Sequence, residues 1–318
     1  MALYRSNLPH LSGGDFLTDG GLETSLIFHS GIDLPCFAAF PLVTSEDGRE
    51  ALRTYFRPYL ETARQRDIGF ILDTVTWRTN ADWGEKLGYS ARDLAEVQRM
   101  SVAFAGALRE AYGTDNSPVV INGILGPRGD GYKADTRMSA MEAEQYHGPQ
   151  IDVFRDTAAD MVSAMTLTYP EEAIGIVRAA QSQGMPVAIS FTVETDGHLP
   201  SGDTLQEAIE RVDAATGSGP IYYMINCAHP KHFENTVTAK GAWLDRIKGI
   251  RANASTLSHA ELDAATELDA GDPEDLGRRY RSLRNSLSQL RILGGCCGTD
   301  HRHIVAICEA CDLRGREA

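Results

Sequence analysis

Three cysteines have the side chains and the spacing best suited to chemistry in this chain. Cys296 and Cys297 are adjacent within a glycine-rich run at residues 294–299, and Cys227 directly follows an apolar run at 221–226. Thiolates are zinc ligands, with Zn–S bonds of about 2.3 Å, and protein-bound zinc is usually tetrahedral. Three cysteines would leave one position for a substrate, which predicts a catalytic zinc site at Cys227, Cys296 and Cys297.

A zinc ion held by three thiolates differs chemically from one held by neutral histidines. The thiolates cancel the charge of the ion, so the centre would be a weak Lewis acid. A thiol bound in the fourth position would still lose its proton, and its sulfur would stay electron-rich. The three cysteines therefore predict activation of a thiol for attack on an electrophilic carbon.

Adjacent cysteines can share one ion only if the backbone turns between them, because neighbouring side chains of a strand point to opposite faces. Gly294, Gly295 and Gly298 permit such a tight turn. Two alternatives for Cys296 and Cys297 stay open at this point, namely a vicinal disulfide and simple packing.

The segments that must position these cysteines alternate between short β-branched runs and longer amphipathic runs, as in repeated βα units. Strands are expected at residues 16–22, 68–75, 119–125, 161–167, 187–193, 221–227, 247–253 and 292–297. Helices are expected at 49–65, 91–112, 141–158, 170–181, 204–215 and 273–290. This α/β pattern, without a low-complexity linker, predicts one closed (β/α)₈ TIM barrel that forms a single domain over residues 1–318. The polar stretch 257–272 is expected to be a solvated excursion.

Active sites of such barrels lie at the carboxyl ends of the strands, where the following loops converge. The candidate residues share this position near predicted strand ends: Asp19, Gly20, Gly21, Asp73, Glu194, Cys227, Asn253, Cys296 and Cys297. One cluster at one mouth of the barrel is the expected arrangement.

The composition excludes several classes of partner. Lysine and arginine number 30 against 44 aspartates and glutamates, and the net charge of −14 disfavours nucleic acid and anionic lipid surfaces. No apolar stretch approaches the roughly 20 residues needed to cross a bilayer, and residues 1–12 lack the apolar core of a secretion signal. We therefore expect a cytoplasmic protein without a membrane partner, while nothing in the sequence indicates an oligomeric state.

The six cysteines are expected to be reduced thiols rather than a disulfide framework. Cys36 is interpreted as a small buried side chain. Cys308 and Cys311 have the Cys-x-x-Cys spacing of redox motifs, but they fall late in the last expected helix, away from the predicted mouth, and packing is favoured.

Several motifs resemble those of the homocysteine S-methyltransferase family, in the same order and over nearly the whole chain. The most specific is GGCCGT at residues 294–299, and INC at 225–227 is similar to the upstream cysteine motif of the family. DGG at 19–21, GILGP at 123–127, YHGPQ at 146–150 and HLPSG at 198–202 are weaker matches.

The resemblance implies a zinc-dependent (β/α)₈ enzyme that moves a methyl group from a sulfonium, betaine or folate donor to the thiol of homocysteine, giving methionine. It implies that Cys227, Cys296 and Cys297 bind zinc and that the turn of Asp19, Gly20 and Gly21 binds the amino-acid end of the acceptor. Asn253 falls where the family carries Pro-Asn-Ser, which implies a substrate contact.

One position departs from the family pattern. Met165 stands where the family has a glutamate that helps to hold the substrate's amino group. Either Glu194, one strand later, supplies the missing charge, or the acceptor is a thiol without that amino group. Asp19 is expected to pair with the ammonium of the acceptor, with helix capping as its alternative role.

The methyl donor and two other classes of protein stay open. S-methylmethionine or S-adenosylmethionine is favoured over betaine, because the sequence shows no folate or cobalamin module and no clear aromatic cage. Trp77 and Trp83 are candidates for cation–π contact with a cationic donor, with loop packing as the alternative. The other classes are a carbon–carbon lyase, indicated only by His229, and a non-catalytic zinc protein whose site a fourth protein ligand closes.

Overall fold

Eight parallel strands form a closed barrel in the computed structural model, which describes residues 1–315. Each strand is hydrogen-bonded to the next along the chain, and the first pairs with the last to close the barrel. The strands are β1 (Phe16–Leu17), β2 (Gly69–Asp73), β3 (Val119–Leu125), β4 (Met161–Leu167), β5 (Val187–Phe191), β6 (Tyr222–Asn226), β7 (Ile247–Ala252) and β8 (Ile292–Gly295). The predicted (β/α)₈ TIM barrel is confirmed.

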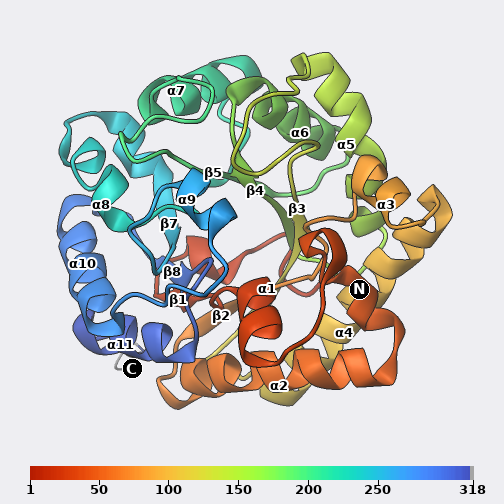
Figure 1. Ribbon diagram of the computed structural model, residues 1–318, viewed down its shortest axis with the longest axis horizontal. Helices are drawn as coiled ribbons and strands as arrows, with labels where there is room; N and C mark the ends of the chain where they lie inside the picture. Colours follow the sequence, from red (N-terminus) through yellow and green to blue (C-terminus); the bar gives the residue numbers. More distant parts are fainter. Residues whose placement is uncertain (316–318) are drawn as a thin grey trace.

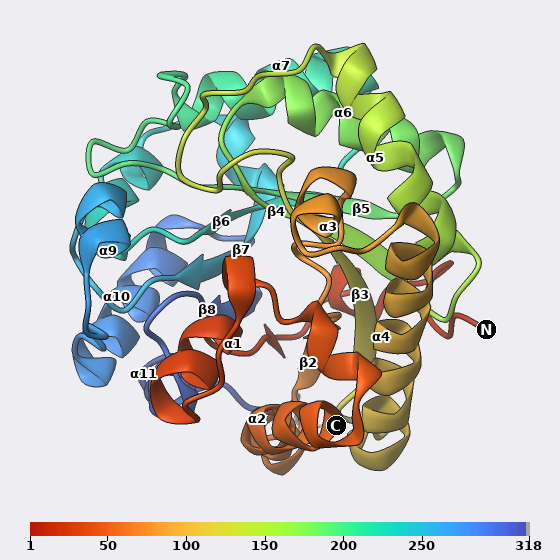
Figure 2. The same ribbon diagram turned by 45° about the vertical axis from the view of Figure 1, so that its right-hand side comes forward.

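Helices surround the strands as an outer ring (Figure 1) and cover them from the side (Figure 2). The long ones are α2 (Glu46–Gln65), α4 (Ala91–Tyr112), α5 (Ala140–Arg155), α6 (Pro170–Ser182), α7 (Leu205–Thr216), α10 (Pro273–Ser286) and α11 (His301–Ala310). Short ones are α1 (Leu22–Thr24), α3 (Ala81–Lys86), α8 (Pro230–Phe233) and α9 (His259–Ala264). All six helices predicted by range are present. Among residues 1–315, no helix has both the length and the apolar character needed to cross a membrane.

Six of the eight strands end earlier than the sequence predicted, and the difference is largest at β1, which was expected to reach residue 22. The backbone leaves the sheet at Gly20 and Gly21 and packs against the loop after β8. A Cβ on Gly20 would lie 2.8 Å from the carbonyl oxygen of Thr299, and one on Gly21 would lie 2.6 Å from that of Cys296. These glycines therefore bring the chain around Asp19 into direct contact with the cysteine turn.

The interior of the barrel is filled by alternate strand residues, as expected for side chains that point to opposite faces in turn. One cluster of buried side chains holds Leu8, Phe16, Ile71, Val120, Ile124, Met161, Met165, Ala188, Tyr222, Met224 and Ile292. His10 packs edge-on against Phe16 and Tyr222, the first residues of β1 and β6. The amino-terminal segment therefore closes the end of the barrel opposite to the strand ends that carry the candidate residues.

The polar stretch 257–272 is mostly exposed to solvent, as predicted, and it also forms part of the mouth of the barrel. It contains α9, which lies in front of the strands near the centre of the ring in Figure 1. His259 at the start of α9 is buried, and Leu262, Asp263 and Asp269 line a cavity at the mouth. The acidic composition predicted exposure to solvent, and Asp263 and Asp269 are exposed while they also line the cavity at the mouth.

Candidate metal centre and substrate cavity

The three predicted zinc ligands come together at the carboxyl ends of β6 and β8. The Sγ atoms of Cys227, Cys296 and Cys297 all lie within 4.8 Å of one another. Within residues 1–315, the group of histidine, cysteine and acidic side chains close enough to share an ion consists of these three cysteines. A fourth protein ligand, which a closed structural zinc site would need, does not belong to this group.

Cys227 and Cys296 are joined as a disulfide, with Cα atoms 5.4 Å apart. The expectation of reduced thiols is therefore not met for this pair, and the vicinal alternative between Cys296 and Cys297 is not formed either. Tetrahedral zinc with bonds of about 2.3 Å would hold two sulfurs about 3.8 Å apart. A disulfide holds its sulfurs only about 2.05 Å apart, so binding of an ion requires the Cys227–Cys296 bond to be reduced and its sulfurs to separate.

The predicted turn at the cysteine pair is present. β8 ends at Gly295, and Gly298 has a φ of 79°, a left-handed conformation that favours glycine. Backbone hydrogen bonds hold the turn to the end of β7: the amide of Cys296 donates to Ala252 at 2.8 Å, and the carbonyl of Cys297 accepts from Ala254 at 3.0 Å. Both cysteines can therefore face the same side, which an extended strand would prevent.

Tyr132, in the loop after β3, contacts one of the candidate metal ligands, Cys297. Its hydroxyl lies 3.5 Å from Sγ of Cys297, and its ring stacks on His259 with 4.0 Å between the ring centroids. Burial raises the pKa of Cys297 to about 11, so this thiol on its own would stay protonated at neutral pH. Tyr132 is not among the residues predicted from the sequence, although the glycine-rich loop at 126–131, placed after a strand, was an available signal.

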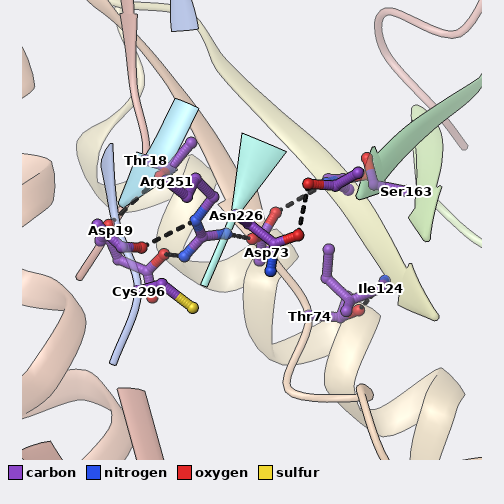
Figure 3. A network of polar contacts seen from close by, with 12 residues as sticks. Thr18, Asp19, Asp73, Thr74, Ile124, Ser163, Asn226, Arg251 and Cys296 are labelled. Atoms are coloured by element: carbon purple, nitrogen blue, oxygen red, sulfur yellow. Dashed lines mark hydrogen bonds and ion pairs between the residues drawn. The ribbon is translucent and has the colours of Figure 1, made fainter. Parts of the chain in front are cut away.

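Beside the cysteines, a buried arginine of β7 links two carboxylates (Figure 3). Arg251 forms ion pairs with Asp19 and with Asp73 and donates through Nε to the carbonyl of Gly295 at 3.1 Å. Burial raises the pKa of Asp19, and it raises that of Asp73 to about 6, in both cases against the lowering effect of Arg251. Asp19 thus has a partner within the chain where an ammonium group of the substrate was expected.

Asp19 does not cap a helix, which was the alternative for this residue. The N-cap of α1 is Gly21, without a side-chain hydrogen bond. The second carboxylate oxygen of Asp19 instead accepts from the hydroxyl of Tyr55 at 3.0 Å. Asp19, Gly20 and Gly21 all lie on the cavity wall, and so does Met165.

Glu194 and Asn253 lie close to the centre but not on the cavity wall formed by the described residues. Glu194 contacts Nδ1 of His259 at 3.1 Å, and Nε2 of the same ring lies 2.8 Å from the carbonyl oxygen of Cys227. Asn253 donates to that carbonyl at 3.0 Å. Both side chains therefore support the backbone that holds Cys227, and a direct substrate contact for either stays a prediction.

Trp77 and Trp83, the predicted partners of a cationic donor, contact a cation of the chain itself, Arg78. The guanidinium carbon of Arg78 lies 4.0 Å from the ring centroid of Trp77 and 3.8 Å from that of Trp83. Each indole also donates to a backbone carbonyl, Trp77 to Met165 of β4 at 3.3 Å and Trp83 to Gly129 of the loop after β3 at 3.4 Å. These contacts agree with the loop-packing alternative, although Trp77 still lines the cavity.

The remaining candidates lie outside the centre. His229 is buried and caps α8 by accepting from the amide of Lys231, so it gives no support to a histidine-ligated lyase site. Cys36 is exposed, which corrects the prediction of a buried side chain; it has a φ of 58° in a loop near the mouth. Cys308 is buried in α11 and Cys311 follows that helix, and both agree with packing.

A single cavity of about 480 Å³ joins these groups at the mouth of the barrel. Its wall includes the three cysteines, Tyr132 and Met165. Its acidic residues are Asp19, Glu23, Asp73, Asp130, Asp263, Glu267 and Asp269, and its basic residues are Arg78 and Arg251. The volume suits a small molecule, and thiols, apolar side chains and charges of both signs are available to bind one.

The family model of homocysteine S-methyltransferase matches residues 16–311. The chain therefore belongs to the homocysteine S-methyltransferase family, as the motifs predicted. Homocysteine S-methyltransferase 1 of Brassica oleracea var. italica is 22% identical over 334 aligned residues, covering 96% of this chain and 95% of that protein. Betaine–homocysteine S-methyltransferase 1 of Rattus norvegicus is 23% identical, covering 82% of this chain and 64% of the rat protein.

Solved structures similar to this barrel include two forms of the homocysteine methyltransferase MmuM from Escherichia coli. The metallated form aligns with a TM-score of 0.70 and 18% identity over 93% of this chain and 96% of that one. The oxidized form gives a TM-score of 0.71 and 18% identity over 92% and 94%. At this identity the likeness supports the fold.

Proposed function

We propose that this chain is a zinc-dependent methyltransferase that moves a methyl group from S-methylmethionine or S-adenosylmethionine to the thiol of homocysteine, giving methionine. The observation that carries the proposal is the group of three cysteine sulfurs within 4.8 Å of one another on the wall of a cavity that fits a small molecule. Membership of the family supports methyl transfer to homocysteine, and the names of the similar proteins agree with it.

The donor set fits zinc, because soft thiolates in a tetrahedral arrangement are typical of zinc sites. Cys227, Cys296 and Cys297 would hold the ion, which requires the reduced form of the Cys227–Cys296 pair. Bound zinc would supply deprotonation of a coordinated thiol while its sulfur stays nucleophilic.

In the proposed reaction, the sulfur of the acceptor forms a bond to the methyl carbon as the carbon–sulfur bond of the donor breaks. The donor leaves as a neutral sulfide, and the proton of the acceptor thiol goes to solvent. Residues of the cavity contribute by alignment and by keeping water away from the reacting sulfur. Gly20 and Gly21 shape the wall beside the cysteine turn, while Val75, Ile124 and Met165 make part of it apolar.

An activity screen tests this function. Zinc-loaded, reduced protein is incubated with homocysteine and, separately, S-methylmethionine, S-adenosylmethionine or betaine, and methionine is measured. Cys296→Ser is the blank, and its zinc content is determined in parallel. Methionine formation with a sulfonium donor that is lost together with zinc in Cys296→Ser supports the proposal; equal turnover after complete removal of zinc contradicts it.

A second candidate is methyl transfer to a thiol that lacks the amino group of homocysteine. Two observations favour it: Met165 occupies the place of the family's glutamate, and Asp19 is already paired with Arg251. The same screen with 4-mercaptobutanoate, which is homocysteine without its amino group, separates the candidates. Glu194→Gln belongs to this comparison, because an unchanged KM for homocysteine would exclude Glu194 as the partner of the ammonium group.

A further inference from the structure

Arg78 is a buried cation in the wall of the cavity, in contact with two aromatic rings. Its exposed fraction is 7%. The guanidinium carbon lies over the rings of Trp77 and Trp83, 4.0 and 3.8 Å from their centroids. Indole faces attract a cation, so the two rings restrict where the guanidinium lies and how another group can approach it.

The hydrogen bonds of this guanidinium are incomplete. A guanidinium has five N–H donors. Across residues 1–315, the hydrogen bond made by the Arg78 side chain is from Nη1 to the carbonyl of Gly129, at 3.2 Å. Nε is buried without any partner in this part of the chain. Most donors of this fixed side chain are therefore available to a ligand or left unsatisfied.

The charge of Arg78 is also unmatched. No carboxylate among residues 1–315 lies within 4.0 Å of it, although Asp130 and Glu23 are near enough to act on it electrostatically. Burial lowers the pKa of Arg78 to about 10, which still leaves the group charged at neutral pH. An unpaired buried charge is costly, and an anion supplied by a ligand would remove that cost.

We propose that Arg78 binds the carboxylate of a substrate in this cavity. A carboxylate is planar and can accept two parallel N–H bonds, which suits a guanidinium whose donors mostly lack partners within residues 1–315. The existence of the anion site stands on Arg78 and its surroundings, and the identity of the ligand as homocysteine or its methyl donor rests on the proposed function. Arg78 is then the residue that distinguishes amino-acid substrates from their decarboxylated analogues.

The test is a binding measurement that needs no turnover. The chain has three tryptophans, and Trp243 lies in the core outside the cavity. In a Trp243→Phe background, the fluorescence therefore reports on Trp77 and Trp83. Zinc-loaded protein is titrated with homocysteine and with 3-aminopropane-1-thiol, which has the same thiol and amine but no carboxylate. A parallel titration uses S-methylmethionine and its decarboxylated analogue.

In one of the two pairs, we expect loss of the carboxylate to raise Kd by about 10- to 100-fold, as for a charged hydrogen-bonded pair. Arg78→Met, whose apolar side chain still fits between the two rings, should reduce that ratio to about one, and Arg78→Lys should keep part of it. The pair that discriminates identifies whether acceptor or donor carries the carboxylate. A ratio near one in both pairs, or a ratio that Arg78→Met leaves unchanged in a folded protein, overturns the proposal.

Failure of the proposed function would look different. Butanoate has neither thiol nor amine, so its binding does not depend on methyl transfer or on zinc. If the activity screen yields no methionine but butanoate still changes the tryptophan fluorescence in Arg78 protein and not in Arg78→Met, the anion site stands and the reaction is another one. If butanoate gives the same response in both proteins, the anion site at Arg78 is wrong.

Discussion

Two buried arginines line the same cavity, and the groups around their charges differ. Arg251 has two carboxylates, Asp19 and Asp73, against its guanidinium. Arg78 contacts two indole rings and one backbone carbonyl, without an ion pair within residues 1–315. The fold thus supplies the counter-charges of Arg251, whereas, within that range, the charge of Arg78 has no ion-pair partner until a ligand supplies one.

The difference separates a structural charge from a ligand-binding one. The pair of carboxylates on Arg251 leaves that cluster with one excess negative charge if both acids are ionised, so a substrate anion would be repelled there. At Arg78 the same anion would meet a cation whose nearby carboxylates, Asp130 and Glu23, form no ion pair with it. The comparison therefore predicts opposite consequences for removing the two side chains: loss of stability for Arg251 and loss of ligand discrimination for Arg78.

The largest expected effect is that of Arg251→Met on stability. It leaves the buried carboxylates of Asp19 and Asp73 without their cation, and we expect the free energy of unfolding to fall by about 3–5 kcal/mol. Urea denaturation at pH 7 measures it. Arg78→Met is the matched control and should change stability by no more than about 1 kcal/mol, because it removes an unpaired charge together with its cation–π contacts. Equal losses in the two variants would contradict the comparison.

The next effect is a pH dependence from Asp73. Its pKa is raised from 3.8 to about 6 in the folded protein, chiefly by burial and partly by Asp19. The folded state therefore binds more protons than the unfolded state between these values, and stability declines as the pH rises from about 4 to about 6. The pKa shift sets an upper limit of about 3 kcal/mol on this decline.

Asp73→Asn isolates that contribution. An asparagine oxygen can still accept from Arg251 but does not titrate. Between pH 4.5 and pH 7 the free energy of unfolding of the wild type should therefore fall relative to that of Asp73→Asn. Urea denaturation at both pH values measures this change. A difference that is independent of pH would mean that Asp73 stays charged throughout, fully compensated by Arg251.

The sequence predicted the cysteine site well, because its geometry follows from local rules. Parallel strands of a closed barrel bring their carboxyl ends to one mouth, so Cys227 and the 294–299 run had to meet there once the barrel was predicted. The glycines around Cys296 and Cys297 predicted the turn, because glycine adopts the backbone conformations that a tight turn needs. The domain's fold and its metal candidates were therefore accessible from pattern and spacing.

The charges around that site could not be predicted in the same way. Arg251 is one polar residue inside an apolar strand run, and its pairing with Asp19 joins residues 232 positions apart. Glu194 was expected to face the substrate, but His259, 65 positions later, contacts it. Such pairings depend on which side chains meet across the barrel, and no periodic signal in either segment encodes them.

The third effect is the increase in stability that a bound ligand gives to the wild type and to the Arg78 variants. A ligand that binds only the folded state adds about 2.7 kcal/mol of stability at a concentration of 100 times its Kd. Homocysteine at that concentration should raise the unfolding midpoint of the zinc-loaded wild type and of Arg78→Lys, and it should raise that of Arg78→Met much less. 3-Aminopropane-1-thiol should produce a similar small increase in all three proteins. An equal increase with homocysteine in wild type and Arg78→Met would mean that Arg78 does not bind the carboxylate of homocysteine, which would leave the methyl donor as its ligand.

The smallest effect is a change in ligand affinity when one of the two indole rings beside Arg78 is removed. Trp83→Leu removes one of the two rings from Arg78, while Trp77 and the bond to the Gly129 carbonyl still hold the guanidinium. A partly exposed cation–π contact contributes about 0.5–1 kcal/mol, so Kd for the carboxylate ligand should rise by about 2- to 5-fold when measured by calorimetry. The ratio between the ligand and its decarboxylated analogue should remain above one, because the charge that distinguishes them is still present. A loss as large as that of Arg78→Met would show that the indole of Trp83 orients the guanidinium completely, and the two rings would then be part of the anion site rather than its supports.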